Sequence, residues 1–368
     1  GLLIGMMIIV NITGRTGLFN YMAVYAAKKV HAQPVKLFFV LSCLTMVSSA
    51  FLDNVTSVLL IVPIIFSLTS QIDVKPFLIA QILASNIGGT ATLIGDPPNI
   101  MIGSAAGFDF MDFIINVAPV SIIVFIINMA ILFLLYRKKL HTTAQLQERV
   151  MRLNEKKEIV DAVLLKKCLF CLALVIILFT THSLLHMETA TAALLGASVM
   201  LLLTCSNDEE ILTDIFSRVE WLSIFFFIGL FILVGGLVET GVIKIMAQEA
   251  MALTHGDVKG SALLVLWLSA IASACIDNIP FVATLLPLIQ ELGAMGIKDL
   301  NPIYWALSLG ACLGGCGTLV GSSANVVVAS MSAQRGKNIS FLKYFYIAFP
   351  LMLLSIAISH CYILYLYF

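Results

Sequence analysis

Two aspartate-asparagine pairs interrupt otherwise apolar stretches of this chain, at Asp53-Asn54 and at Asp277-Asn278. A carboxylate near the centre of a bilayer costs about 2.5–3.5 kcal/mol on the insertion scale, so an acidic residue in such a stretch indicates a functional site by default. The alternative is that each aspartate caps a helix by accepting backbone N–H bonds. Because the two roles are compatible, we predict that both pairs bind a substrate or a coupling ion, either H⁺ or Na⁺.

The polar neighbours of the two pairs differ. Asn54 and Asn278 each carry a carbonyl oxygen and an amide group, which suit the coordination of a cation and also the bracing of a turn. Thr56 adds a hydroxyl group in the first copy, whereas Pro280 occupies its place in the second. The two half-sites therefore need not bind the same species, and a turn-forming role stays open beside a role as ligand.

Each pair is followed by the motif Gly-Gly-x-x-Thr-x-x-Gly and then by an asparagine. We expect these residues to present backbone and side chains to a ligand, although the glycines also suit close packing of helices. They are Gly88, Gly89, Thr92, Gly95 and Asn99 in the first copy and Gly314, Gly315, Thr318, Gly321 and Asn325 in the second.

The first copy of the motif continues into Asp96-Pro97-Pro98, and two consecutive prolines cannot stay in an unbroken helix. Irregular backbone at membrane depth is tolerated where protein covers it or where it lines a wet cavity. We therefore predict a broken helix and a binding site here. Asp96 has Ser322 as its counterpart, so it is either a second titratable group or a helix cap.

The composition is that of an integral membrane protein. Hydrophobic residues make up 60% of the chain and charged residues 11%, with a mean hydropathy of +1.03, whereas soluble domains carry about 25% charged residues. Apolar runs near the ~20 residues that cross a bilayer predict an all-α polytopic bundle. These runs cover residues 114–136, 167–184, 187–205, 220–238 and 344–367.

The chain contains an internal repeat, because residues of the same type recur 224 positions apart. Each copy reads as an apolar helix, a short amphipathic stretch, a hairpin folded about Asp-Asn, and a broken helix. The hairpins cover residues 36–68 and 260–292, and their arms of about 15 residues are too short to span, which predicts re-entrant hairpins. The broken helices cover residues 76–104 and 302–332.

The basic residues indicate the topology. Residues 137–167 carry nine basic and four acidic side chains, which predicts a cytoplasmic loop. Five crossings separate the start of the first repeat from the start of the second, so the second repeat is expected to be inverted, and one or two further helices are expected before residue 1. The expected units are the first repeat, truncated at its N-terminus, at 1–136, the basic cytoplasmic loop at 137–166, two scaffold helices at 167–205, a short cytoplasmic loop at 206–219 and the second repeat at 220–368.

Other classes of protein are disfavoured by the sequence. The net charge is zero, so there is no general basic field for nucleic acid. The motifs of a metalloprotease, a serine hydrolase and a phosphate-binding loop are absent from the sequence, so we expect neither an enzyme nor a cofactor. A channel would use similar polar breaks, and a separate ATPase subunit would also be compatible with the chain.

Four motifs resemble those of the arsenical-permease and P-protein branch of the ion transporter superfamily, which is citrate-transporter-like and distantly similar to the divalent anion/sodium symporters. The motifs are Phe51-Leu-Asp-Asn-Val-Thr-Ser-Val-Leu-Leu, Ser85-Asn-Ile-Gly-Gly-Thr-Ala-Thr-Leu-Ile-Gly-Asp-Pro-Pro-Asn, Cys275-Ile-Asp-Asn-Ile-Pro-Phe and Gly314-Gly-Cys-Gly-Thr-Leu-Val-Gly-Ser-Ser-Ala-Asn. The resemblance implies two re-entrant hairpins, two broken helices, a homodimer and elevator-type movement. It also places the two Asp-Asn pairs where the symporters carry Ser-Asn-Thr tips that bind sodium and substrate.

The aspartates depart from that pattern. An aspartate in place of serine puts negative charge or a titratable proton where a dicarboxylate would sit, which argues against citrate or succinate unless the aspartates are protonated. We therefore expect gradient-driven movement, in the direction of export, of a small inorganic solute such as arsenite or a related metalloid acid. A Na⁺/H⁺ antiporter is the alternative, and an anion symporter or a channel ranks below it. The expected location is the plasma (inner) membrane, with the loop 137–166 in the cytoplasm.

Overall fold

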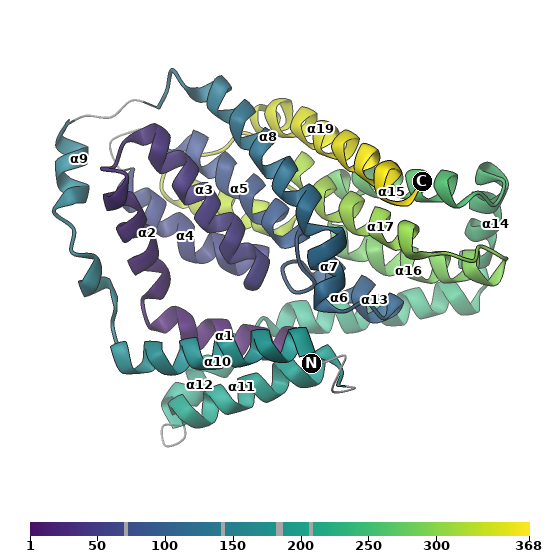
Figure 1. Ribbon diagram of the computed structural model, residues 1–368, viewed down its shortest axis with the longest axis horizontal. Coiled ribbons are helices and arrows are strands. Elements are labelled where there is room, and N and C mark those ends of the chain that lie inside the picture. The colour runs from purple at the N-terminus through teal and green to yellow at the C-terminus, as the bar shows by residue number, and fades with distance from the viewer. Residues whose placement is uncertain (70–72, 141–143, 182–186, 206–208) are drawn as a thin grey trace.

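The computed structural model describes residues 1–69, 73–140, 144–181, 187–205 and 209–368, and within these ranges it is helical without strands. In Figure 1 the helices of the first half, in purple and blue, gather beside those of the second half, in green and yellow. The all-α fold predicted from the sequence is therefore confirmed.

Six helices of the described chain are long and apolar enough to cross a membrane, and a seventh span results if two helices bent by 58° count as one. The six are α3 (Pro34–Phe51), α8 (Ala118–Tyr136), α10 (Ala162–Thr181), α13 (Trp221–Glu239), α15 (Val258–Cys275) and α19 (Phe341–Tyr367). The bent pair is α1 (Leu2–Arg15) and α2 (Leu18–Lys29). A shorter apolar helix, α11 (Thr189–Cys205), accounts for the remaining predicted run.

The predicted order of elements occurs in both halves. In the first half α3 is followed by α4 (Asn54–Leu68), α5 (Lys75–Thr90), α6 (Pro97–Ala106) and α7 (Phe110–Asn116). In the second half α13 leads through α14 (Val242–Thr254) to α15, α16 (Asn278–Ala294), α17 (Asn301–Gly314), the 3₁₀ turn η2 (Gly315–Gly317) and α18 (Ser323–Gln334). The Asp-Asn pairs thus lie at the turns of two helical hairpins, and the Gly-rich motifs lie at two helix breaks.

Close packing holds each hairpin against the broken helix that follows it. The helix α3 packs along α5, and α15 packs along α17. A Cβ atom built on Gly88 would lie 2.3 Å from the carbonyl oxygen of Met46, and one on Gly314 would lie 2.5 Å from that of Ala270. Only glycine permits this approach of two helix backbones, and the same contact recurs at the same place in both halves.

The first arm of each hairpin is longer than predicted. Both α3 and α15 have 18 residues instead of about 15, since they begin at Pro34 and Val258. At 1.5 Å per residue each is about 27 Å long, close to the thickness of a bilayer core. The second arms, α4 with 15 residues and α16 with 17, are closer to the predicted length, and the re-entrant and inverted arrangements stay predictions.

The predicted basic loop 137–166 is partly helical. It contains α9 (Ala144–Met151) and η1 (Glu155–Glu158), and α10 already begins at Ala162. The segment is tied to α2, because Lys28 Nζ bonds Glu155 at 2.6 Å and the carbonyl oxygen of Leu153 at 2.9 Å. The predicted loop 206–219 likewise contains α12 (Glu209–Ser217). Residues 141–143 and 206–208 of these two loops lie outside the described ranges.

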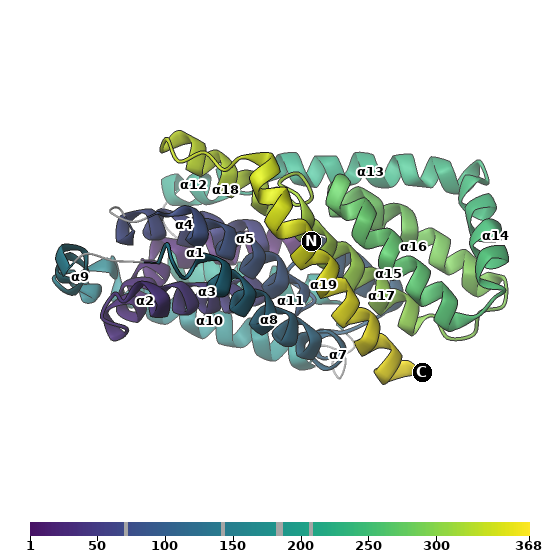
Figure 2. The same cartoon turned by 90° about the horizontal axis from the view of Figure 1, so that it is seen from above.

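A layer formed by α1, α10, α11 and α12 runs along one side of the first half (Figures 1 and 2). The two halves also meet at α8 and α19, which run side by side. There the buried Asn128 on α8 donates from Nδ2 to Ser355 Oγ on α19 at 2.9 Å. Between the halves, Asn54 and Asn278 of the turns and Asp96 and Ser322 of the breaks are buried.

Candidate functional site

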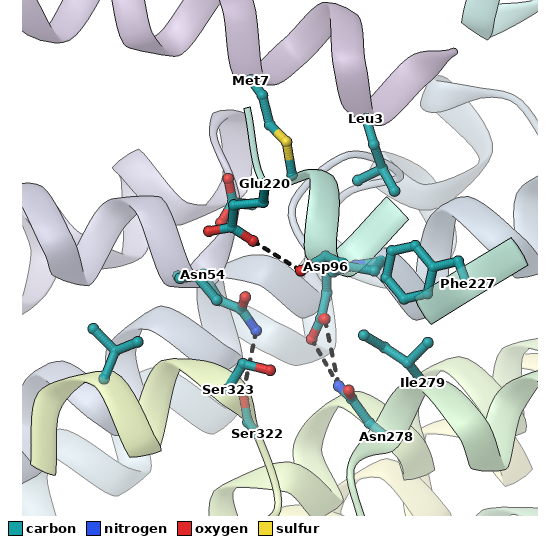
Figure 3. Close-up of a pocket in the computed structure, with 15 residues that line it drawn as sticks. Leu3, Met7, Asn54, Asp96, Glu220, Phe227, Asn278, Ile279, Ser322 and Ser323 are labelled. Carbon is teal, nitrogen blue, oxygen red and sulfur yellow. Dashed lines mark hydrogen bonds between the residues drawn. The ribbon is translucent and has the colours of Figure 1, made fainter. Parts of the chain in front are cut away.

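A pocket of about 180 Å³ lies where the two hairpin turns and the two helix breaks meet. Apolar side chains of α1 and α13, including Met7 and Phe227, close one side of it (Figure 3). Its polar lining comes from Asp53, Asn54, Asp96, Glu220, Ser223, Asn278, Ser322 and Ser323. The pocket therefore collects polar residues separated by as much as 270 positions in the sequence.

Both hairpin aspartates cap the helix that follows them. Asp53 Oδ1 accepts the backbone N–H of Thr56 at 2.7 Å, and its other oxygen accepts the Thr56 hydroxyl. Asp277 accepts the N–H of Ile279 and the hydroxyl of Ser323, both at 3.2 Å. The capping role is thus confirmed, and binding of an ion or a substrate stays a prediction. Of the two aspartates, Asp53 lines the pocket and Asp277 lies beside it.

The asparagines of the two turns reach across to the opposite half. Asn54 Nδ2 donates to Ser322 Oγ at 3.5 Å, and Asn278 Nδ2 donates to both carboxylate oxygens of Asp96 at 3.4 Å (Figure 3). Ser322 and Asp96 hold equivalent places in the two breaks. Each asparagine thus contacts the equivalent position in the helix break of the opposite half.

The asparagines of the two breaks donate hydrogen bonds to backbone carbonyl groups at the ends of the interrupted helices. Asn99 Nδ2 lies 2.9–3.3 Å from the carbonyl oxygens of Gly89, Thr90 and Thr92, and Asn325 Nδ2 lies 2.7–2.8 Å from those of Gly315 and Thr318. The hydroxyl groups of Thr92 and Thr318 bond the carbonyl oxygens of Ala50 and Ala274. Buried carbonyl groups need such partners once the helix ends. These four predicted site residues brace the breaks and do not line the pocket.

The predicted glycines pack backbone against backbone. A Cβ atom built on Gly95 would lie 2.7 Å from the carbonyl oxygen of Ser49, and one on Gly321 would lie 2.7 Å from that of Ser273. Gly89 and Gly315 are likewise crowded by the backbone of the break that follows each of them. The packing interpretation therefore holds for all six, none lines the pocket, and contact with a ligand stays a prediction.

Asp96 is buried, with 1% of its surface exposed, and it lines the pocket. It stands before the first residue of α6, but its side chain makes no capping hydrogen bond. Of the two roles that the sequence left open, the cap is therefore wrong, because the carboxylate turns toward Asn278 instead.

Sequence reasoning missed Glu220 and Asn86. Glu220 lines the pocket and accepts the hydroxyl of Ser223 at 3.1 Å (Figure 3). The available signal was an acidic residue at the start of an apolar run. Asn86 lies behind Asn54, which donates to its Oδ1 at 3.3 Å. It belongs to the quoted Gly-rich motif but has Cys312 as its counterpart, so the repeat did not single it out.

The pocket is acidic. Asp53, Asp96 and Glu220 line it, and no lysine, arginine or histidine is among the described residues that do so. The nearby Arg218 is paired with Asp214, 2.9 Å away. No group of three or more histidine, cysteine, aspartate or glutamate side chains in the described ranges is placed to hold a metal ion.

Comparison with known proteins gives consistent matches. Residues 1–310 match the sequence model of the citrate transporter family. An uncharacterized transporter of Mycobacterium bovis is 41% identical over 371 residues, which cover 100% of this chain and 85% of that protein. The 46 kDa membrane protein of Mycobacterium leprae is 40% identical over 366 residues, or 98% and 84% of the two chains. The P protein of Homo sapiens is 33% identical over 444 residues, which cover 99% of this chain and 52% of that protein.

Proposed function

Since the chain belongs to the citrate transporter family, we propose that this integral, multi-pass membrane transport protein couples the movement of a small solute to a gradient of H⁺ or Na⁺. The P protein among its relatives agrees with the branch that the motifs indicated. Both the family and the transporter names of its relatives are those of transport proteins, not of enzymes.

One observation supports this function above the others: three carboxyl groups and no basic side chain line the pocket between the hairpin turns, among the described residues. Like charges brought together in a poorly solvated site repel strongly. A polyanion such as citrate would meet that repulsion, whereas a cation or an uncharged acid would not. We therefore do not propose citrate as the transported solute, although the family is named after it.

The size of the pocket favours a small cargo. Its volume of about 180 Å³ lies below the range of about 300–1,000 Å³ of sites for drug-sized ligands. We propose arsenite or a related metalloid acid, which is uncharged near neutral pH, with export driven by the ion gradient. A gradient of 100 mV supplies about 2.3 kcal/mol for each charge moved.

A Na⁺/H⁺ antiporter is the second candidate. It is favoured by the hardness of the ligands, since carboxylate and amide oxygens line the pocket and suit hard cations. The thiols of Cys312 and Cys316, which would suit a soft metalloid, are buried outside the pocket lining.

The proposed mechanism moves the two hairpins and the two broken helices together past the remaining helices, as in an elevator. The reciprocal bonds of Asn54 and Asn278 support this idea, because they join the two halves at the pocket itself. We further propose a homodimer in the plasma (inner) membrane with residues 137–166 in the cytoplasm.

The test uses proteoliposomes of the full-length protein, with pH and Na⁺ gradients imposed in turn while arsenite and internal pH are followed together. We expect arsenite movement driven by a gradient and lost in Asp53→Asn and Asp277→Asn. The matched control is Asp299→Asn, because the exposed Asp299 also accepts a backbone N–H before a helix, at 3.1 Å from Asn301, but lies outside the pocket. Na⁺-driven pH change without arsenite movement would make the protein an antiporter. Movement of neither solute under either gradient would refute both candidates.

A further inference from the structure

A series of buried carboxamides connects the second helix break to the pocket. It begins at Asn325, whose Nδ2 donates to the backbone carbonyl oxygens of Gly315 and Thr318. A carbonyl oxygen can only accept, so the amide nitrogen of Asn325 is fixed on that side. Its Oδ1 consequently faces Asn86, where it accepts a bond of 2.7 Å.

The orientation of Asn86 follows from that of Asn325. Asn86 Nδ2 donates to Asn325 Oδ1 and, at 2.9 Å, to the carbonyl oxygen of Ile82. Both of its protons are then used, so its Oδ1 is the atom that faces Asn54. Asn86 is fully buried and does not line the pocket, which makes it a supporting residue that cannot itself touch a solute.

Asn54 is the last member of the series. Its Nδ2 donates to Asn86 Oδ1 at 3.3 Å and to Ser322 Oγ at 3.5 Å, and Figure 3 shows the nitrogen turned toward Ser322. Both protons are again used, so the carbonyl oxygen is the free end of the side chain. Since Asn54 lines the pocket, this oxygen is available to a ligand there.

The second half orients its own asparagine differently. Cys312 stands in the place of Asn86, and its thiol, together with the Ser308 hydroxyl, approaches Asn99 Oδ1 at 3.4 and 2.7 Å. No amide therefore continues the series toward Asn278. Instead the carboxyl group of Asp96 accepts from Asn278 Nδ2, so that a carboxyl acceptor takes the place that Asn86 has in the first half.

From these contacts we infer that Asn86 is a positioning residue, which holds the carbonyl oxygen of Asn54 toward the pocket as a ligand for the coupling cation. The inference rests on the proposed cation coupling, and it adds a residue that orients one of the cation ligands. Without the acceptor on Asn86, the Asn54 amide is free to turn over and to present N–H groups, which repel a cation. Replacing a residue that orients a ligand in this way usually lowers ion affinity by about 10–100-fold.

The test measures cation binding without transport. Thermal unfolding of the purified full-length protein is followed against NaCl, with choline chloride keeping the ionic strength constant, and separately against pH. We expect Asn86→Cys, which copies the second half, to raise the half-saturating Na⁺ concentration at least about tenfold. If the ion is H⁺, weaker proton binding lowers the midpoint pH by about one unit instead.

Asn128→Cys is the matched control. Asn128 is also a buried amide that joins the two halves, through Ser355, but it lies on α8 away from the pocket. Its variant should lose stability without a change in cation affinity. If Asn86→Cys cannot be purified, Asn86→Ser carries the same expectation, because a hydroxyl is equally unable to span the distance to Asn54.

A rescue separates orientation from a general loss of structure. Ser322→Asp gives Asn54 the carboxyl acceptor that Asn278 has in Asp96. In a protein that carries Ser322→Asp, the further change Asn86→Cys should therefore raise the half-saturating Na⁺ concentration less than about threefold. An equal cost in both backgrounds, or an equal effect of Asn128→Cys, would overturn the inference while leaving cation coupling intact. A wild-type protein that responds to neither Na⁺ nor pH would overturn cation coupling, and the role of Asn54 with it.

Discussion

Replacement of Gly314 by alanine tests the packing that places the second helix break. The added methyl group would lie 2.5 Å from the carbonyl oxygen of Ala270, about 1 Å inside ordinary contact distance. The obstacle is backbone and cannot rotate away, so α15 and α17 must separate. Overpacking of this kind costs about 1–3 kcal/mol, and the rigidity of the obstacle favours the upper end. We expect the unfolding midpoint to fall by roughly 5 °C.

The assay is thermal unfolding of the full-length protein in detergent, with Gly235→Ala as the control. Gly235 lies in α13, and a Cβ atom there meets nothing within 4 Å, so alanine should leave the midpoint unchanged or raise it slightly through its better helix propensity. Gly88→Ala should resemble Gly314→Ala, because its methyl group would lie 2.3 Å from the carbonyl oxygen of Met46. Equal midpoints for Gly314→Ala and Gly235→Ala would refute the argument that backbone contact requires glycine here.

Two further predictions concern charged residues. Asp96→Asn removes a buried carboxyl group that faces Asn278, and we expect it to raise the half-saturating Na⁺ concentration for stabilisation against unfolding at least about tenfold. An unchanged half-saturating concentration would exclude Asp96 as a cation ligand. Glu155 has a pKa held below its ordinary value by its hydrogen bond with Lys28, so docking of the segment 144–160 gains stability above pH 4.5 and loses it as the pH falls through the lowered pKa. Proteolysis of this segment should therefore increase at low pH in the wild type, and Lys28→Met should show the increased rate already at neutral pH; equal rates at neutral pH would contradict this role of the ion pair.

The elements of the fold followed well from local sequence features. Asp53 and Asp277 each precede a helix, and the prolines after Asp96 coincide with the break before α6. The lengths of the first hairpin arms were underestimated, because these helices begin two residues earlier than predicted, at Pro34 and Val258. Helix ends depend on caps and neighbours that a hydrophobic pattern records poorly.

The repeated polar residues that the sequence singled out have two different roles in the structure. The repeat identified Asp53, Asn54 and Asn278, which all line the pocket. It also selected Asn99 and Asn325, whose side chains brace the backbone of the breaks instead. A repeated polar residue is compatible with either role, since both halves need to satisfy the same exposed carbonyl groups.

The sequence by itself determined that this is a polytopic helical membrane protein with two related halves, because apolar runs, paired prolines and recurring motifs act through neighbouring residues. Only the tertiary structure decided that Asn54 meets Ser322, that Asn278 meets Asp96, and that Glu220 joins the same pocket. It also decided that the glycines pack against backbone and that Asn86 accepts a hydrogen bond from Asn54. The physical reason is that these interactions join residues far apart in the chain, and their partners are set by how the two halves pack together.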